Sequence, residues 1–257
     1  MTNPTSSIDQ FKYQPETIQS GTVYHYIKSN IDGSYPARVY IRVMDTDNLE
    51  VWKFEEHNVD AAHVSAHMDW KTFSADKIES WVVTSDGNRR YQAKLTSSQA
   101  DNSFTIHWRG RADTIQVGHY PVHVYNFDFI SLNLSLRYWV KPESVVTIGI
   151  IQPDFNPKPD TLVKYEGTVT IHYVGDEHRH NKACRKYTIV GHAFQGQQGL
   201  RWVDRSAGHI EDMEIPVPDN PAWEDFKFEL FSINRMDRET WDTFLYSEIK
   251  KLKAWSD

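Results

Sequence analysis

YPVHVYNFDFISLNLSLRYWVKPESVVTIGII, residues 120–151, is the longest apolar-rich run of the chain, and strand-like sequence lies on both sides of it. Apolar side chains recur through its middle at helical spacing and cover most of the circumference, as in a helix enclosed by other structure. Asp128 is placed to cap such a helix, and Pro142 is placed to end it. We therefore predict a buried central helix near 126–140 and a buried strand at 145–151.

A strand is the alternative for the middle of this run. Leu132, Leu134, Leu136 and Tyr138 alternate with polar residues, which is the period of a strand with one buried face. The possible cap, Asp128, and the proline that would end the helix, Pro142, favour the helix. A sheet strand over these residues in the structure would refute this prediction.

Short alternating segments separated by turn residues occupy most of the remaining chain, which is the pattern of an antiparallel meander. Residues 1–20 are polar, and we expect them to form a loose arm. We interpret 21–257 as a single β-rich domain, because two β halves, 21–118 and 145–233, would each leave a sheet face uncovered without the helix between them. The fold class predicted is mainly β: a large curved antiparallel sheet or open barrel, lipocalin-like.

The end of the chain has the clearest helical pattern. Asp237 can cap a helix at 237–253, and a single apolar stripe runs along it. We expect this amphipathic helix to pack on the sheet. The stripe consists of Trp241, Phe244, Leu245, Ile249, Leu252 and Trp255.

Composition limits the function classes. The chain has 257 residues, a formal net charge of −7 and 13% aromatic residues. An acidic protein does not suit a nucleic-acid backbone or an anionic membrane as its main partner, because both need a basic face. The polar N-terminus has no signal-peptide core and the single cysteine, Cys184, cannot form an internal disulfide. From these features we expect a soluble cytoplasmic protein.

Three segments in the second part of the chain resemble a known group in their order: Tyr125–Leu132 (YNFDFISL), Cys184–Tyr187 (CRKY) and Trp202–Ile210 (WVDRSAGHI). The pattern is similar to bacterial proteins of uncharacterised role with a lipoprotein-carrier-like or lipocalin-like curved sheet. This resemblance implies a large antiparallel sheet wrapped on a helix, and it transfers no functional residues. Proteins with that pattern are usually exported, whereas this chain shows no export signal.

The tryptophans suggest a ligand site. Trp52, Trp70, Trp81 and Trp108 fall one per predicted strand, and Trp139 lies in the central helix. Aromatic side chains on one face of a curved sheet can enclose a small molecule. We therefore predict that an apolar small molecule binds beside these five residues without a cofactor.

Acid–base catalysis in the same cavity is the alternative function. His67 and Asp69 share one face of a predicted strand, and His123 lies just before the central helix. Such groups could serve a cofactor-free lyase, hydratase or isomerase. Whether they point into the aromatic pocket or away from it distinguishes the enzyme from the binding protein.

Twelve histidines also raise the question of a metal. His172, His178 and His180 lie close together in sequence, but zinc needs three or four converging ligands and no firm spacing of that kind occurs. Cys184 lies inside a predicted strand, where a buried unreactive thiol is expected. We therefore predict no structural metal.

Overall fold

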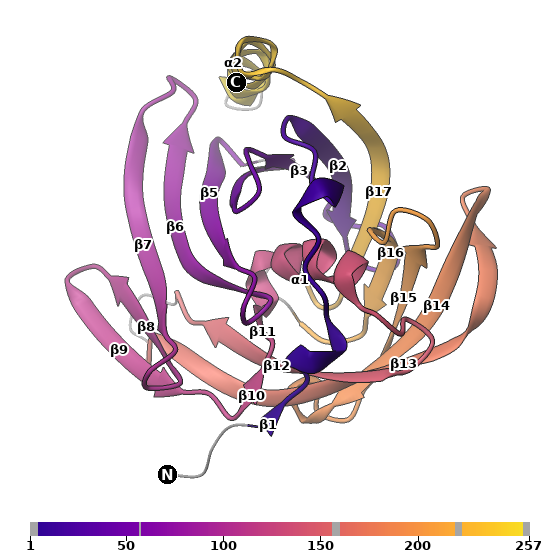
Figure 1. The fold of residues 1–257 in the computed structure, drawn as a ribbon. Helices are drawn as coiled ribbons and strands as arrows, with labels where there is room; N and C mark the ends of the chain where they lie inside the picture. The colour runs from indigo at the N-terminus through magenta and orange to yellow at the C-terminus, as the bar shows by residue number, and fades with distance from the viewer. Residues whose placement is uncertain (1–4, 57, 156–159, 219–222, 254–257) are drawn as a thin grey trace.

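The computed structural model describes residues 5–56, 58–155, 160–218 and 223–253. Fifteen strands form one continuous curved sheet in the order β11-β12-β13-β14-β15-β16-β17-β2-β3-β4-β5-β6-β7-β8-β9. Figure 1 shows this sheet curling around the short central helix α1 (Ile130–Ser135), with the C-terminal helix α2 (Arg238–Lys253) outside it. The predicted mainly β class, with a large curved antiparallel sheet and two helices, is confirmed.

The strands correspond closely to the segments predicted from alternation. Before the central helix they are β2 (Thr22–Ser29), β3 (Ala37–Val43), β4 (Asn48–Glu55), β5 (Asp60–Asp69), β6 (Ser74–Thr84), β7 (Arg89–Ser98), β8 (Ser103–Trp108), β9 (Arg111–Gln116), β10 (His119–Tyr120) and β11 (Val122–Val124). After it they are β12 (Val145–Pro153), β13 (Val163–Arg179), β14 (Lys182–Gly191), β15 (Gln198–Asp204), β16 (Ile210–Ile215) and β17 (Phe226–Arg235).

The two β halves are joined by backbone pairing as well as by the central segment. Strand β17 pairs antiparallel with β2 over most of its length, which places Phe228 opposite Lys28. The far ends of the sheet also approach each other, because the Leu162 N–H donates to Asp113 of β9 at 2.6 Å. In the described residues no strand pairing closes this gap, so the sheet is open.

The central segment is helical but more broken than predicted. A 3-10 turn at Tyr125–Phe127 precedes α1, and a second one at Leu136–Tyr138 follows it. Asp128 does not cap the helix: it has a left-handed backbone, with φ of 53°, and its carboxylate binds two lysines. The prediction of this cap was wrong because the carboxylate found stronger partners far away in sequence.

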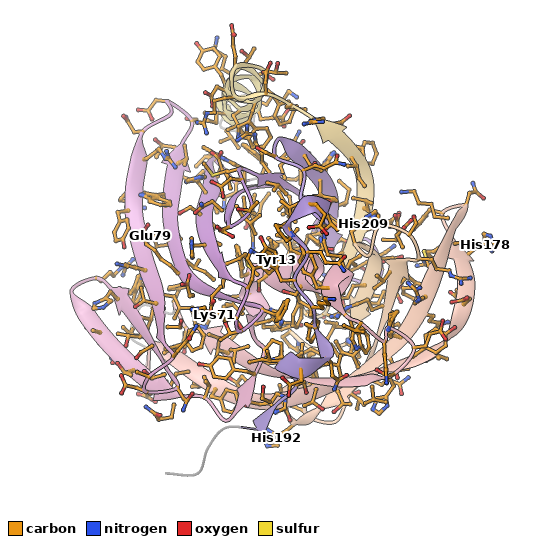
Figure 2. The ribbon with its side chains drawn as sticks, viewed as in Figure 1. Tyr13, Lys71, Glu79, His178, His192 and His209 are labelled. Carbon is orange, nitrogen blue, oxygen red and sulfur yellow. The ribbon has the colours of Figure 1, made fainter. Side chains whose placement is uncertain are left out.

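The N-terminal arm, which we expected to be loose, is packed from residue 5 onward. Residues Thr5–Ser6 (β1) pair with β10, and Phe11 forms an isolated bridge with Trp139. The Tyr13 ring stacks on Trp70 with centroids 4.7 Å apart, and Figures 1 and 2 show the arm crossing the open side of the sheet. Aromatic contacts of this kind outweigh the polar character of the arm.

Helix α2 covers the outer face of the first β half. The Asp237 carboxylate accepts the Thr240 N–H at 2.8 Å, which confirms the predicted cap. Trp241 is fully buried, and it packs with other side chains of α2 on an apolar cluster of the strands. Trp255 of the predicted stripe lies outside the described residues. Among the residues described, no helix is both long and apolar enough to cross a lipid bilayer.

Candidate functional site

A cavity of about 310 Å³ lies on the inner face of the first β half, below the turn that leads into α1. Thirteen of its nineteen lining residues are apolar, and most of these are aliphatic. This composition suits an apolar ligand better than a polar one. The apolar residues are Ala37, Val39, Ala62, Val64, Ile78, Ala93, Leu95, Ile106, Val124, Phe127, Pro153, Phe155 and Trp223.

Alternation along the strands directs these side chains inward, because successive residues of a strand point to opposite faces. Three of the inward positions, Ala37, Ala62 and Ala93, carry only a methyl group. Larger residues at the same positions would fill the space between the sheet and the central segment. The small side chains therefore leave room for the cavity.

A buried ion triad stands at one end of this cavity. Asp128 accepts from Lys28 Nζ at 2.8 Å and lies 2.5 Å from Lys53 Nζ, and both lysines also line the cavity. Lys53 Nζ donates in addition to the Asn126 carbonyl at 3.1 Å. The Lys28 ammonium lies 4.2 Å from the centroid of the Trp223 ring. Charged groups thus define a polar end for an otherwise apolar space.

The two lysines control the charge of Asp128. Burial by itself would raise the pKa of this carboxyl, since it disfavours the charged form. The positive charges of Lys28 and Lys53 outweigh that effect and hold the pKa of Asp128 below its usual range. The carboxylate is therefore ionised at neutral pH and fixes both ammonium groups.

The structure distributes the four strand tryptophans over both faces of the sheet. Trp70 and Trp108 pack against the inner core, and Trp108 contacts Phe155 of the cavity wall with ring centroids 5.8 Å apart. Trp52 lies in the outer cluster under α2, and Trp81 packs on the same side against His63. The sequence placed all four on one wall, but strand parity directs two of them outward.

Trp139 lines a different, larger cavity between the N-terminal arm and the second β half. Trp223, which sequence reasoning passed over, lines the first one. It follows the segment 216–221 (PVPDNP), in which three of the six residues are proline. A lone tryptophan after this segment was the only signal that the sequence offered.

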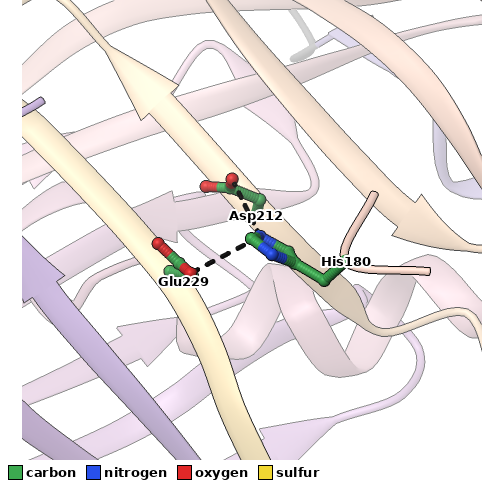
Figure 3. Close-up of side chains that lie close together, drawn as sticks. All are labelled: His180, Asp212 and Glu229. Atoms are coloured by element: carbon green, nitrogen blue, oxygen red, sulfur yellow. Dashed lines mark ion pairs between the residues drawn. The ribbon is translucent and has the colours of Figure 1, made fainter. Parts of the chain in front are cut away.

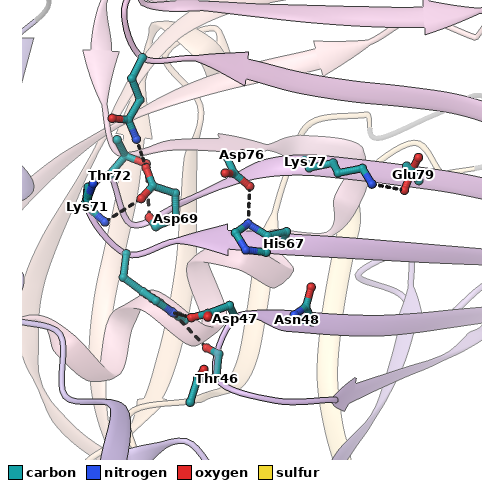
Figure 4. A network of polar contacts seen from close by, with 12 residues as sticks. Thr46, Asp47, Asn48, His67, Asp69, Lys71, Thr72, Asp76, Lys77 and Glu79 are labelled. Atoms are coloured by element: carbon teal, nitrogen blue, oxygen red, sulfur yellow. Dashed lines mark hydrogen bonds and ion pairs between the residues drawn. The ribbon is translucent and has the colours of Figure 1, made fainter.

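The proposed acid–base pair is not assembled. His67 Nδ1 lies 2.7 Å from Asp76, and Asp69 instead accepts from the Lys71 N–H and the Thr72 hydroxyl, as Figure 4 shows. Both side chains lie on the strand face opposite to Val64 and the cavity. The structure therefore directs both side chains away from the cavity, which favours a binding site over a catalytic one.

His123 is sealed inside the molecule. Its Nδ1 lies 2.8 Å from the Ser131 hydroxyl, and the ring is fully buried between β11 and α1. Burial, with a further contribution from Arg201, lowers the pKa of His123 to about 3. His123 itself lines neither cavity, and a buried neutral imidazole of this kind is a packing element rather than a general base.

Two groups of described side chains bring three possible metal ligands together: His180 with Asp212 and Glu229 (Figure 3), and Asp204 with His209 and Glu211. Neither group contains His172 or His178, and Figure 2 shows His178 at the far end of the β13–β14 hairpin.

Both groups already have cationic or N–H partners. Asp212 is paired with Arg179, and Glu229 with Lys227 at 2.8 Å. In the second group, Lys182 binds Glu211 at 2.8 Å, and backbone N–H groups bind Asp204. Each of these carboxylates thus has at least one partner, although the buried Asp212 Oδ1 has no hydrogen-bond partner among the described residues. Cys184 is buried, and burial raises the pKa of its thiol to about 11, as expected for an unreactive cysteine.

No family model matches the chain, and no curated protein matches it in sequence. Solved structures that resemble it include a domain assigned to outer membrane lipoprotein sorting from Vibrio parahaemolyticus, with 8% identity, a TM-score of 0.31 and coverage of 89% of this chain and 91% of that one. A DUF1329 family protein from Desulfovibrio piger has 10% identity and a TM-score of 0.31, with coverage of 91% and 93%. The Mycobacterium tuberculosis lipoprotein LppX has 8% identity and a TM-score of 0.25, with coverage of 85% and 89%.

These are bacterial proteins of the kind that the motif order resembles. The function therefore has to be argued from the side chains of this chain.

Proposed function

We propose that the protein binds a neutral, largely aliphatic molecule in the 310 Å³ cavity of the first β half. The observation that carries this proposal is the lining itself, in which nine of the thirteen apolar residues are alanine, valine, leucine or isoleucine and only three are aromatic. Walls that are mainly aliphatic favour an alkyl chain over a flat polar ligand. The volume lies near the lower end of the range for ligand sites, so the bound part is small.

Polar side chains of the lining give the ligand an orientation. Lys28 and Lys53 are engaged with Asp128, whereas the Ser80 and Gln92 side chains also line the space and can bind a hydroxyl or carbonyl group. The ligand expected is therefore an alkyl chain that ends in an uncharged polar group.

A chain-length series tests this proposal. Straight-chain alcohols of increasing length compete with Nile red, a neutral fluorescent probe. Each buried methylene contributes about 0.8 kcal/mol, so affinity should rise about fourfold per added carbon until the cavity is full. The rise should then stop, because further carbons remain in water.

Cavity-filling variants locate the binding. Ala62→Phe and Ala93→Phe place a ring in the cavity and should weaken alcohol binding about tenfold or more, with an unchanged circular dichroism spectrum. The matched control is Ala112→Phe, an exposed position on β9 that does not line the cavity. Equal affinity in all three folded variants and wild type would place the ligand elsewhere.

A further inference from the structure

A second cavity of about 570 Å³ lies on the inner face of the other β half. Its walls include the N-terminal arm, the 3-10 turn Leu136–Tyr138 with Trp139, strands β14 and β15, and the loop 205–209, with further residues from β2, β3 and β17. Gly208 allows this loop to approach closely: its φ is +70°, and an added Cβ would lie 2.7 Å from the Arg137 Cα. The approach brings the loop and the 3-10 turn to one space.

Three arginines line this cavity, and none of its lining residues is acidic. Arg205 is paired with Asp176 at 2.6 Å. Arg137 and Arg185 have neutral partners instead: Arg137 Nη2 donates to the Tyr24 hydroxyl, and Arg185 Nη1 donates to the Arg205 carbonyl, each at 3.0 Å. In a protein of net charge −7, two arginines without carboxylates beside one cavity are a local excess of positive charge.

Three buried donors at this cavity have no hydrogen-bond partner: Arg137 Nε, Arg185 Nε and Trp139 Nε1. Trp139 is 4% exposed. Leaving a buried donor unpaired costs about 1–3 kcal/mol, and more for a charged group. An acceptor that reaches these donors would remove that cost.

The adjacent wall increases the positive potential. Arg201 of β15 is opposite Tyr187 of β14, is fully buried, and has two further nitrogens without partners. Burial lowers the pKa of Arg201 only to about 9, so the guanidinium keeps its charge at neutral pH. The acidic groups nearby are already engaged: Glu211 binds His209 and Lys182.

From this geometry we propose that the second cavity binds a small organic oxyanion with a flat apolar body. The carboxylate or phosphate group would accept from Arg137, Arg185 and Trp139, because guanidinium groups match planar oxyanions in charge and shape. The body would lie against Tyr24, Trp139 and Tyr187, which supply aromatic walls. The volume exceeds that of a bare inorganic anion, so the cavity has room for such a body.

Calorimetric titration of the wild-type protein tests the charge requirement directly. Naphthoate and naphthyl phosphate are the anionic probes, naphthamide is the neutral counterpart, and inorganic phosphate is the anion without a body. We expect at least one of the two aryl anions to bind about tenfold or more tightly than naphthamide, since hydrogen bonds to charged groups contribute about 1.5–3 kcal/mol. It should also bind more tightly than inorganic phosphate.

Two conservative variants locate the anion. Arg185→Gln removes a charge that donates to a backbone carbonyl rather than to a carboxylate in the described residues, and Trp139→Phe removes the N–H but keeps an aromatic ring. Each should weaken binding of the aryl anion about tenfold. Arg90→Gln, at an exposed position on β7, removes the same charge outside the cavity and should leave binding unchanged.

The proposal is overturned if naphthamide or inorganic phosphate binds wild type as tightly as both aryl anions. It is equally overturned if both folded variants bind like wild type. The proposals for the two cavities can be tested separately. Ala62→Phe should weaken binding of the alcohols in the first cavity and leave binding of the aryl anions in the second cavity unchanged.

Discussion

Asp128→Asn is the sharpest test of the ion triad. The carboxylate has no solvent exposure, and its partners Lys28 and Lys53 are only 2% and 15% exposed. Asparagine tolerates the left-handed backbone at this position, so the substitution removes the charge and leaves the turn intact. Removing one partner of a buried ion pair costs about 3–5 kcal/mol, because the remaining charges are unpaired.

Urea denaturation at neutral pH measures this loss. Folded domains have a free energy of unfolding of about 5–15 kcal/mol, so the midpoint should fall by a large fraction. The control is Glu79→Gln, which removes the partner of Lys77 in a pair that is 45% and 23% exposed; it should cost about 1 kcal/mol or less. A loss for Asp128→Asn no larger than in this control would refute the argument.

The pH dependence gives a second check on Asp128. Its pKa is lower in the folded than in the unfolded state, where it is about 3.9. The stabilisation is therefore complete above that value and disappears as the pH falls through the folded pKa. The difference between wild type and Asp128→Asn should stay constant from pH 7 to about pH 5 and shrink only in more acidic solution.

Two further predictions concern α2 and the buried histidine. Trp241→Ala should lower the free energy of unfolding, measured by urea denaturation, by about 3–5 kcal/mol, since Trp241 is fully buried between α2 and the sheet. Tyr246→Ala, on the exposed side of the same helix, should lower it by about 1 kcal/mol or less. Equal losses in the two variants would contradict the packing of α2 on the outer face of the sheet. The pKa of His123 is about 3 in the folded state and about 6.5 when unfolded, so the stability it contributes is complete above about pH 6.5 and declines as the pH drops toward 3. The loss of stability between pH 6.5 and 4.5 should be smaller in His123→Gln than in wild type, and an identical pH profile would contradict a neutral buried imidazole.

Local pattern predicted the strands because side-chain alternation is a local property. In β3, Val39, Ile41 and Val43 face the inner core, as their spacing indicated. The pairing of β17 with β2 brings together residues about two hundred positions apart, and nothing in either strand specifies that neighbour. The sequence therefore predicted a large curved sheet, but not which strands pair where its two halves meet.

The candidate site was less predictable for a similar reason. Asp128 precedes a helical pattern, which made a cap the local expectation, yet Lys28 and Lys53 reach it from strands 100 and 75 positions away. Arg137 lies in the predicted central helix, whereas Arg185 and Arg205, which line the same cavity, come from the second β half. Clusters made by tertiary contact have no sequence spacing.

The tryptophans show what limits the assignment of faces in this fold. Strands β2 to β6 are apolar on both sides, because α2 buries the outer face while the core buries the inner one. The alternation of side chains along a strand then separates two sets of residues, but it does not show which set faces the inner core. Trp52 bonds Glu50 under α2, and Val51 between them points inward. Helix α2, far downstream in the sequence, thus buries Trp52 in a second apolar cluster on the outer face of the sheet. The cavity on the inner face is lined instead largely by small aliphatic residues.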